Sequence, residues 1–248
     1  MKKMIMLVLA LSLTIILAAC GDDSESASDK SKEGSKDKKT EETAQPAAED
    51  VKITDKEKVD KDKVVTKING EEIKGKQYNT SYAQTKTLMS QYGQDVSDVK
   101  NVKEQTLNVI VEQELIKQEA TNKGIEVTDE EVQKQFETIK EQNADQFSAV
   151  LEQYNLTEET YKDQLAFELT LQKYMKQEIK GKEVTDEEVQ KYYDKLKEQS
   201  KGQEGQEVPK LEDVKDQIKG QLKQQQQQQQ LQAKVEQLKK NAEVKHMI

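Results

Sequence analysis

A helical spacing of apolar residues runs almost without interruption from residue 77 to residue 241, and it restricts the fold more than any other feature. Apolar side chains recur every three or four residues, as in a helix with one buried stripe. Only about a fifth of all residues are Leu, Ile, Val or Phe, close to the level at which highly charged chains stay unfolded. The pattern therefore favours long amphipathic helices with much of their surface in water over a thick, enzyme-like core.

The periodic region divides into six helical segments. We expect helices over 77–91, 99–122, 129–154 with a break near Asn143, 158–180, 186–199 and 210–241. The segment 158–180 is the most apolar, so we expect more than one of its faces to be buried. Before the helices, two short β-prone runs flank Asn69-Gly70, which predicts a hairpin over 64–73. The first helix has a weak start, because Lys74-Gly75-Lys76 stands where a Ser, Thr or Asp cap is usual.

An eleven-residue motif occurs twice, in residues 124–134 and 181–191, and the copies differ at a single position. Its glycine predicts the left-handed end of one helix, and its Thr-Asp-Glu-Glu predicts a capping box at the start of the next. The residues concerned are Gly124, Thr128 and Glu131 in the first copy and Gly181, Thr185 and Glu188 in the second. Calcium binding by these acidic clusters is the alternative, but the alternating spacing and turn glycine of a calcium loop are missing.

Residues 224–230 are seven consecutive glutamines. Such a run is typical of aggregation-prone tracts, but glutamine is also a good helix former. Because the run lies inside a Lys/Leu helical pattern, we expect a solvated helix face.

The N-terminus has the layout of an export signal. Two lysines precede an apolar run that is too short to span a membrane, and Leu17-Ala18-Ala19-Cys20 resembles the bacterial lipobox. We therefore expect residues 1–19 to be a lipoprotein signal peptide and Cys20, the only cysteine, to carry the lipid. This would anchor the protein on the outer face of the cell membrane. The alternative is an ordinary signal peptide with an incidental cysteine.

The next segment, residues 20–62, contains hardly any apolar residue. Such a segment cannot bury enough surface to offset its ordering entropy. We expect a disordered tether that spans roughly 35–40 Å and separates the bilayer from a helical domain over 63–248.

The composition excludes most catalytic, metal and nucleic-acid chemistry. There is one cysteine, no arginine, and one histidine, His246, which lies so close to the end that it is a poor catalytic base. The formal charge of −9 argues against affinity for nucleic acid, and no phosphate-binding loop, catalytic triad order or zinc motif occurs. We expect no catalytic residue, no metal site, no cofactor and no nucleotide partner.

Tyrosine and methionine remain as candidate binding residues, because soft and aromatic side chains suit many unlike apolar partners. The alternative for each residue is that it fills the core. Five that lie at helix ends or off the main apolar stripes are the candidate surface contacts: Tyr82, Met89, Tyr92, Tyr154 and Tyr174.

Several stretches, taken in order, resemble the chaperone domain of the PrsA/SurA family of exported folding factors. They are Val64–Ile73, Leu115–Ala120 with Gly124–Val132, Leu156–Leu165, Val184–Asp194 and Pro209–Leu222. The resemblance covers about residues 63–198 and 208–245. It implies a mainly α fold, a lobe of amphipathic helices with a short N-terminal β-hairpin, and unfolded or partly folded exported proteins as partners.

The sequence departs from the family at one place. Full-length relatives carry a parvulin-type prolyl isomerase domain between the helix with Tyr192-Tyr193 and the closing helix, but here the interval 199–209 is a short Gly/Gln loop. The resemblance therefore implies a membrane-anchored, ATP-independent chaperone that is not an enzyme. Two alternatives stay open: a prolyl isomerase by family inheritance with a degenerate or absent site, and a structural adaptor lipoprotein of the cell envelope.

Overall fold

The computed structural model describes residues 51–144, 146–154, 156–200 and 209–248. Several predictions concern residues outside these ranges. They are the signal peptide 1–19, the lipid attachment at Cys20, the tether over 20–50 and most of the loop 199–209.

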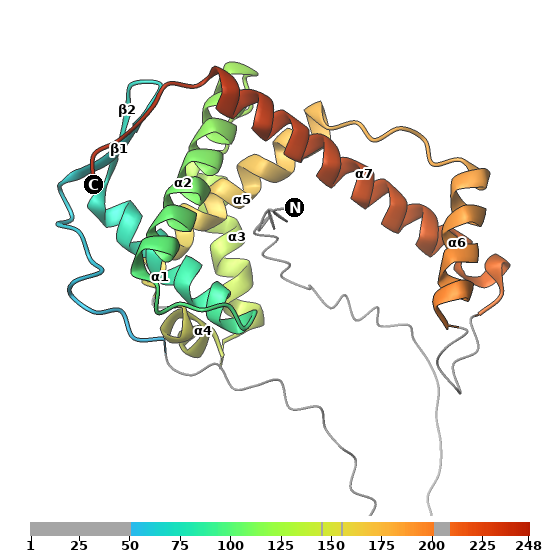
Figure 1. The fold of residues 1–248 in the computed structure, drawn as a ribbon, viewed down its shortest axis with the longest axis horizontal. Coiled ribbons are helices and arrows are strands. Elements are labelled where there is room, and N and C mark those ends of the chain that lie inside the picture. The colour runs from blue at the N-terminus through green and yellow to red at the C-terminus, as the bar shows by residue number, and fades with distance from the viewer. Residues whose placement is uncertain (1–50, 145, 155, 201–208) are drawn as a thin grey trace, which may run out of the picture. The chain divides into compact units, whose positions relative to one another are not determined.

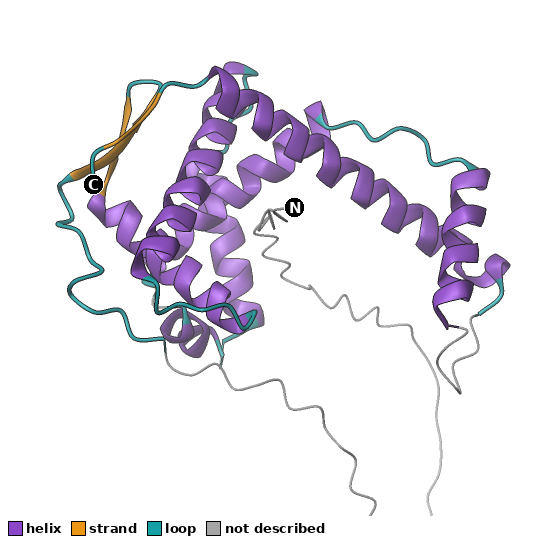
Figure 2. Ribbon diagram, viewed as in Figure 1, coloured by secondary structure: helices purple, strands orange, loops and turns teal. Residues whose placement is uncertain are grey.

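Helices dominate the described residues, with one small sheet at the N-terminal side (Figure 1, Figure 2). The elements in chain order are β1 (Val64–Ile68), β2 (Glu71–Lys74), α1 (Gly75–Gln91), α2 (Val99–Asn122), α3 (Asp129–Gln142), α4 (Phe147–Gln153), α5 (Glu158–Glu178), α6 (Asp186–Ser200), α7 (Leu211–Asn241) and β3 (Val244–His246). The mainly α fold with a short N-terminal hairpin is confirmed. Every predicted helix is present, and the expected break near Asn143 separates α3 from α4.

The hairpin forms around the predicted turn. Asn69 and Gly70 both have positive φ, 52° and 91°, as a two-residue hairpin turn requires. The third strand, β3, was not predicted. It pairs antiparallel with β1, so the strand order is β2-β1-β3 and the C-terminal end of the chain joins the sheet.

Two buried clusters hold the long helices together, and the first of them includes the sheet. The first, the sheet core, joins β1 and β2 to one face of α1 and α2; its buried residues are Val65, Ile68, Ile73, Tyr78, Tyr82, Met89, Val102, Leu107, Ile110, Val111 and Leu115. The second, the α2–α5 core, comprises Ile116, Ala120, Ile125, Tyr174 and Ile179, with α7 packed against it. Helix α2 therefore contributes to both.

A third cluster, the aromatic core, holds α3, α4 and α5 together. Phe136, Phe147 and Tyr161 meet edge to face, with ring centroids 5.3–6.0 Å apart. Such arrangements are favoured by the quadrupoles of the rings. A fourth cluster, the α6–α7 core, consists of Val184, Val189, Tyr193 and Ile218.

The two copies of the repeat fold alike in their capping boxes but differ at their glycines. The threonine of each copy accepts a hydrogen bond from the backbone of the glutamate three residues on, whose carboxylate accepts from the threonine N–H. Gly124 has φ +70° and ends α2 as predicted. The left-handed conformation predicted for Gly181 is wrong. That glycine instead lies beside the side chains of Lys223 and Gln227 of α7.

The predicted tether is wrong for its last residues, 51–62. This segment, called the strap below, lies against α1 and the sheet core. Glu57 is buried there, and Ile53 and Val59 pack against the sheet core. The composition argument failed because a buried ion pair and backbone hydrogen bonds hold the strap in place, with little apolar area.

The weak start of α1 is completed by the chain that precedes β1. Its N-cap offers no side-chain hydrogen bond. Instead, the N–H groups of Gly75 and Lys76 donate to the carbonyls of Lys63 and Lys61, at 2.8 and 2.9 Å. This close approach requires glycine, because a Cβ at Gly75 would overlap the carbonyl oxygen of Asp60. Tertiary contacts therefore supply the cap that the sequence lacks.

Candidate functional site

The structure places the five candidate contact residues in different environments. Tyr82 and Met89 are buried in the sheet core and Tyr174 is buried in the α2–α5 core, so their prediction as surface contacts is wrong. Their rings and thioether fill space between elements that the sequence alone does not bring together. Tyr92, at the end of α1, is 68% exposed, and Tyr154, after α4, is partly exposed. Only these two are accessible to a partner.

A larger apolar surface, which the sequence did not single out, lies on α5 and α7. Helix α5 has only two fully buried residues, Leu165 and Tyr174, although it contributes to two cores. Because Leu165 and Tyr174 lie in different cores, more than one face of α5 is buried as predicted, but most of its apolar side chains stay partly exposed. The α5–α7 apolar surface is defined as Phe167, Leu171 and Met175 of α5 with Leu231 and Val235 of α7, all packed against the α2–α5 core.

Helical spacing places these side chains together. The three residues of α5 are four apart and lie on one face, as do the two residues of α7. Beneath them, burial raises the pKa of Tyr174 to about 12, in keeping with a phenol enclosed by apolar neighbours. The surface is thus a continuation of a packed core, and its residues do not stand alone.

A polar residue interrupts the apolar face of α5. Burial raises the pKa of the Glu168 carboxyl, and the hydrogen bond from Gln172, at 3.3 Å, only partly offsets this effect. Among the residues that the structure describes, none forms an ion pair with Glu168, and an unpaired carboxylate would be costly in a closed core. Its place here fits a surface that water still reaches.

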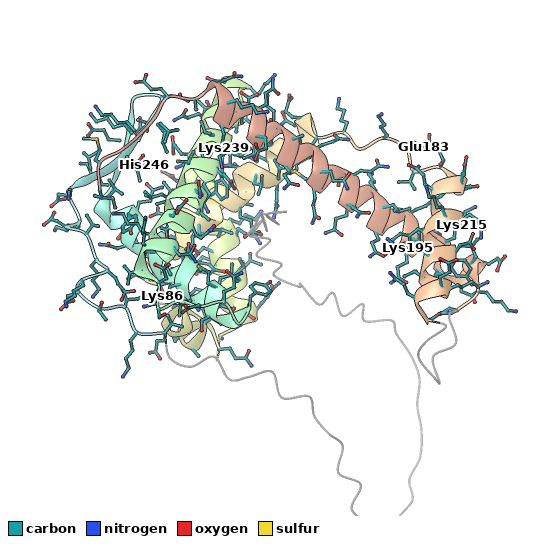
Figure 3. All side chains as sticks on the ribbon, viewed as in Figure 1. Lys86, Glu183, Lys195, Lys215, Lys239 and His246 are labelled. Carbon is teal, nitrogen blue, oxygen red and sulfur yellow. The ribbon has the colours of Figure 1, made fainter. Side chains whose placement is uncertain are left out.

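Ion pairs fasten α7 at both of its ends. Near its C-terminus, Lys239 and Lys234 lie 3.0 and 2.8 Å from Glu112 and Glu119 of α2. Near its start, Lys215 and Lys219 both lie 3.0 Å from Asp186 of α6. Lys215 and Lys239 are seen at opposite ends of the helix in Figure 3. The two pairs with Asp186 are exposed and contribute little stability, whereas the pairs with Glu112 and Glu119 are partly buried.

The α6–α7 core adjoins the interval in which the sequence predicts a loop in place of a catalytic domain. The hydroxyl of Tyr193 donates to the carbonyl of Pro209 at 2.7 Å, so the two sides of that interval meet. Tyr192, Leu196, Leu211, Val214 and Leu222 are partly exposed around this core. These side chains form a second, smaller apolar surface.

The described residues contain no group of three or more His, Cys, Asp or Glu side chains arranged to hold a metal ion. His246 lies in β3, where its Nδ1 is 3.1 Å from the hydroxyl of Thr66. None of the helices between residues 51 and 248 that the structure describes has a stretch both long and apolar enough to cross a bilayer. The described residues therefore offer a partner apolar contact area bordered by charged side chains.

Comparison with known proteins agrees with this geometry. The model of the SurA-like N-terminal domain matches residues 51–175, which is half of the chain and includes the strap. The Foldase protein PrsA of Clostridium perfringens (strain 13) is 35% identical over 156 residues, covering 57% of this chain and 44% of that protein. The Foldase protein PrsA of Caldanaerobacter subterraneus subsp. tengcongensis is 33% identical over 146 residues, covering 54% and 43%.

A shorter match, 42% identical over 74 residues, is to the Foldase protein PrsA 2 of Bacillus cereus, covering 29% of this chain and 26% of that protein. The chain thus spans less than half the length of the curated relatives that it matches. Three observations point to the same family: the order of the sequence motifs, the fold, and the match of the domain model over half of the chain. The chain belongs to the PrsA/SurA family, and the part that carries the match is a SurA-like N-terminal domain.

Proposed function

We propose that the chain is a chaperone for exported proteins that binds unfolded or partly folded segments without using ATP. The observation that carries the proposal is the SurA-like N-terminal domain over residues 51–175, in a chain whose relatives bear the name foldase. The α5–α7 apolar surface supports it, because partly exposed apolar side chains on a packed core can gain area by contact with a client.

Each client contact would be weak. Apolar area contributes roughly 25 cal/mol per Å² when it is removed from water, so one partly exposed side chain contributes under about 1 kcal/mol. Binding would then depend on several such contacts at once, made by the α5–α7 apolar surface together with Tyr92 and Tyr154. The charged residues around them would keep a loaded complex in solution. Release needs no nucleotide, because folding of the client buries the same apolar groups.

The chaperone activity is tested by aggregation of a reduced, unfolded secreted protein, followed by light scattering. We expect suppression at a stoichiometric ratio, unchanged by added ATP. Changing Met175 or Phe167 to Gln should weaken suppression about threefold, since each change removes contact area worth about 0.7 kcal/mol. The matched control is Val150→Gln, on the exposed side of α4. Absence of suppression by the unaltered chain would contradict the proposal.

We also propose that the chain is not a prolyl isomerase. The hydrogen bond from Tyr193 to Pro209 supports this, because it joins the two sides of the interval in which relatives carry the parvulin domain. In a proline-peptide isomerisation assay we expect only the uncatalysed rate. A rate that increases with protein concentration would contradict this part of the proposal.

The proposed location follows from the N-terminal sequence. We propose that residues 1–19 are removed and that Cys20 carries a lipid that anchors the chain on the outer face of the cell membrane. Cys20→Ser should move the protein from the membrane fraction to the soluble fraction and abolish incorporation of labelled lipid. Retention of the label by that variant would contradict the assignment.

A further inference from the structure

The strap, residues 51–62, lies on α1 through contacts that resemble those of a bound peptide. The side-chain amide of Asn79 accepts a hydrogen bond from the N–H of Val59 at 2.9 Å and donates one to its carbonyl at 2.7 Å. One side chain thus satisfies both backbone groups of a strap residue. Recognition of this kind does not depend on which side chain the bound residue carries.

A charged contact accompanies the backbone contacts. Glu57, only 6% exposed, accepts hydrogen bonds from Lys86 at 2.6 Å and from the Tyr82 hydroxyl at 2.8 Å. Lys86 also donates to the carbonyl of Lys52 at 2.9 Å. Lys86 is labelled on α1 in Figure 3. This face of α1 therefore offers one cation and one hydroxyl to a carboxylate, and further donors to backbone carbonyls.

The strap also makes apolar contacts with the molecule. Ile53 and Val59, four residues before Glu57 and two residues after it, pack against the sheet core while staying partly exposed. The segment that fits the face of α1 bearing Asn79, Tyr82 and Lys86 thus has an acidic residue between two apolar residues. It turns before the acidic residue, where the N–H of Glu57 donates to the carbonyl of Thr54 at 3.0 Å.

The two parts of the strap are held by different kinds of contact. Its C-terminal end is held by the backbone of α1. The N–H of Lys76 donates to the carbonyl of Lys61, and the backbone of Asp60 lies close to Gly75. Residues 51–59 are held only by side chains. If they left without replacement, the buried groups of Tyr82 and Lys86 would lose their partners, which is costly. A second polypeptide that supplies the same groups would offset that loss.

We propose that this face of α1 is a polypeptide-binding site that residues 51–59 occupy in cis. Its second ligand is a segment of an unfolded client that adopts the same turn, with an acidic residue flanked by apolar residues, and that exchanges with the strap. The inference rests on the proposed function, because it states where and by what chemistry such a client segment binds. Occupancy by the strap would lower the apparent affinity for clients in proportion to the fraction of time that the site is open.

The test uses the full chain and a fluorescein-labelled peptide of sequence VKITDKEKVD, the strap from Val51 to Asp60. In a chain with Glu57→Ala and Val59→Pro the strap loses its carboxylate and the N–H that Asn79 binds, while α1 is unchanged. By fluorescence anisotropy we expect this variant to bind the peptide at least about tenfold more tightly than the unaltered chain. Lys58→Ala, at an exposed strap position, is the matched control and should bind as the unaltered chain does.

A further change checks that the peptide occupies the proposed face. Adding Asn79→Ala to the strap-released variant removes two hydrogen bonds and should weaken peptide binding about tenfold. Circular dichroism and thermal unfolding establish that each variant is folded. A folded strap-released variant that binds no more tightly, or whose binding is unaffected by Asn79→Ala, would overturn the proposal.

A measurement on the unaltered chain tests displacement of the strap without any substitution. Hydrogen exchange at the Val59 amide should become faster when reduced, carboxymethylated α-lactalbumin is added, because the client displaces the strap. The Ile110 amide, inside α2, should not change. If the chain binds the client and suppresses its aggregation but the Val59 amide stays protected from hydrogen exchange, the inference fails and the proposed function stands. If aggregation is not suppressed, the proposed function fails, whatever the strap peptide does.

Discussion

At the scale of single residues, one buried carboxylate and its hydrogen-bond partners hold the strap in place. Burial opposes ionisation of Glu57, but hydrogen bonds from Lys86, Thr54 and Tyr82 outweigh it and lower the pKa of its carboxyl from 4.5 to about 2. Glu57 thus carries its charge inside the protein and keeps the strap on α1. A chain with few large apolar residues here uses a paired charge to order a segment that its composition would leave disordered.

The lowered pKa of Glu57 predicts how stability depends on pH. Because the folded-state pKa lies below the unfolded value, the ionised carboxylate contributes stability above about pH 4.5, and this contribution is lost as the pH falls from 4.5 toward 2. The difference corresponds to at most about 3 kcal/mol. Glu57→Gln should therefore lower the free energy of unfolding at pH 7, and the difference from the unaltered chain should shrink below pH 4.5. Urea unfolding at pH 7, 5 and 3 measures it.

The control for this prediction is Glu104→Gln, on the exposed side of α2, which should change stability equally little at all three pH values. A destabilisation by Glu57→Gln that stays constant from pH 7 to pH 3 would show that the charge of Glu57 is not its cause.

Two glycines provide a matched pair of substitutions. At Gly75 a Cβ would overlap the carbonyl of Asp60, whereas at Gly220, inside α7, nothing lies within contact distance. Gly75→Ala should destabilise the protein, because the strap must move and the start of α1 loses its backbone partners. Gly220→Ala should stabilise it by up to about 1 kcal/mol, through the better helix propensity of alanine. Thermal unfolding of both variants measures the effects, and a change of the same sign in both would contradict this account.

At the scale of elements, the duplicated motif shows one local structure in two tertiary contexts. The capping box at Thr128 starts α3, and its Glu131 also pairs with Lys173 of α5 at 2.7 Å. The capping box at Thr185 starts α6, which packs on α7. The same local signal therefore stabilises one helix inside the larger set of cores and another inside the small α6–α7 core.

Removing the two caps should have different effects. Thr128→Ala and Thr185→Ala should each cost about 1 kcal/mol in the helix that they cap. Because α3 is tied to α5 through Glu131 and the aromatic core, Thr128→Ala should lower the stability of α3 and α5 together. Thr185→Ala should affect α6 and the first half of α7 alone. Hydrogen exchange resolved by helix distinguishes the two, and equal loss of protection in α5 from both variants would contradict the prediction.

At the scale of the whole molecule, the described helices differ in how many buried residues they contribute to the cores. Helix α2 contributes buried residues to the sheet core and to the α2–α5 core. Helix α6 contributes only Val189 and Tyr193, both in the small α6–α7 core. Stability is therefore expected to vary along the chain, since local opening costs less where few apolar contacts are lost.

This unequal sharing predicts the order of opening. In native-state hydrogen exchange, amides of α6 should exchange through an opening of lower free energy than amides of α2, and they should do so well below the denaturant midpoint. The first half of α7, which packs on α6, should open with it. Exchange of α6 and α2 amides at one common free energy would instead indicate a single cooperative unit.

Sequence alone determined the helices, the hairpin turn and the capping boxes, because the signals for them are local. Helical spacing, the Asn69-Gly70 turn and the Thr-x-x-Glu capping boxes depend on neighbours within a few residues, and all are present as predicted. The prediction that Tyr82 and Met89 are surface contacts overlooked one local signal. Their spacing from Tyr78 puts the three on one helix face, and that face is buried in the sheet core.

Tertiary structure decided the rest, because it depends on contacts between residues far apart in sequence. The strap is held by the ion pair of Glu57 with Lys86, and β3 forms because the C-terminal end of the chain pairs with β1. Which apolar side chains remain exposed, and so could bind a partner, was settled by the packing of α5 and α7 on α2. No local sequence pattern predicts this exposure. An amphipathic helix has the same spacing of apolar residues whether the neighbouring element covers its apolar face fully or in part.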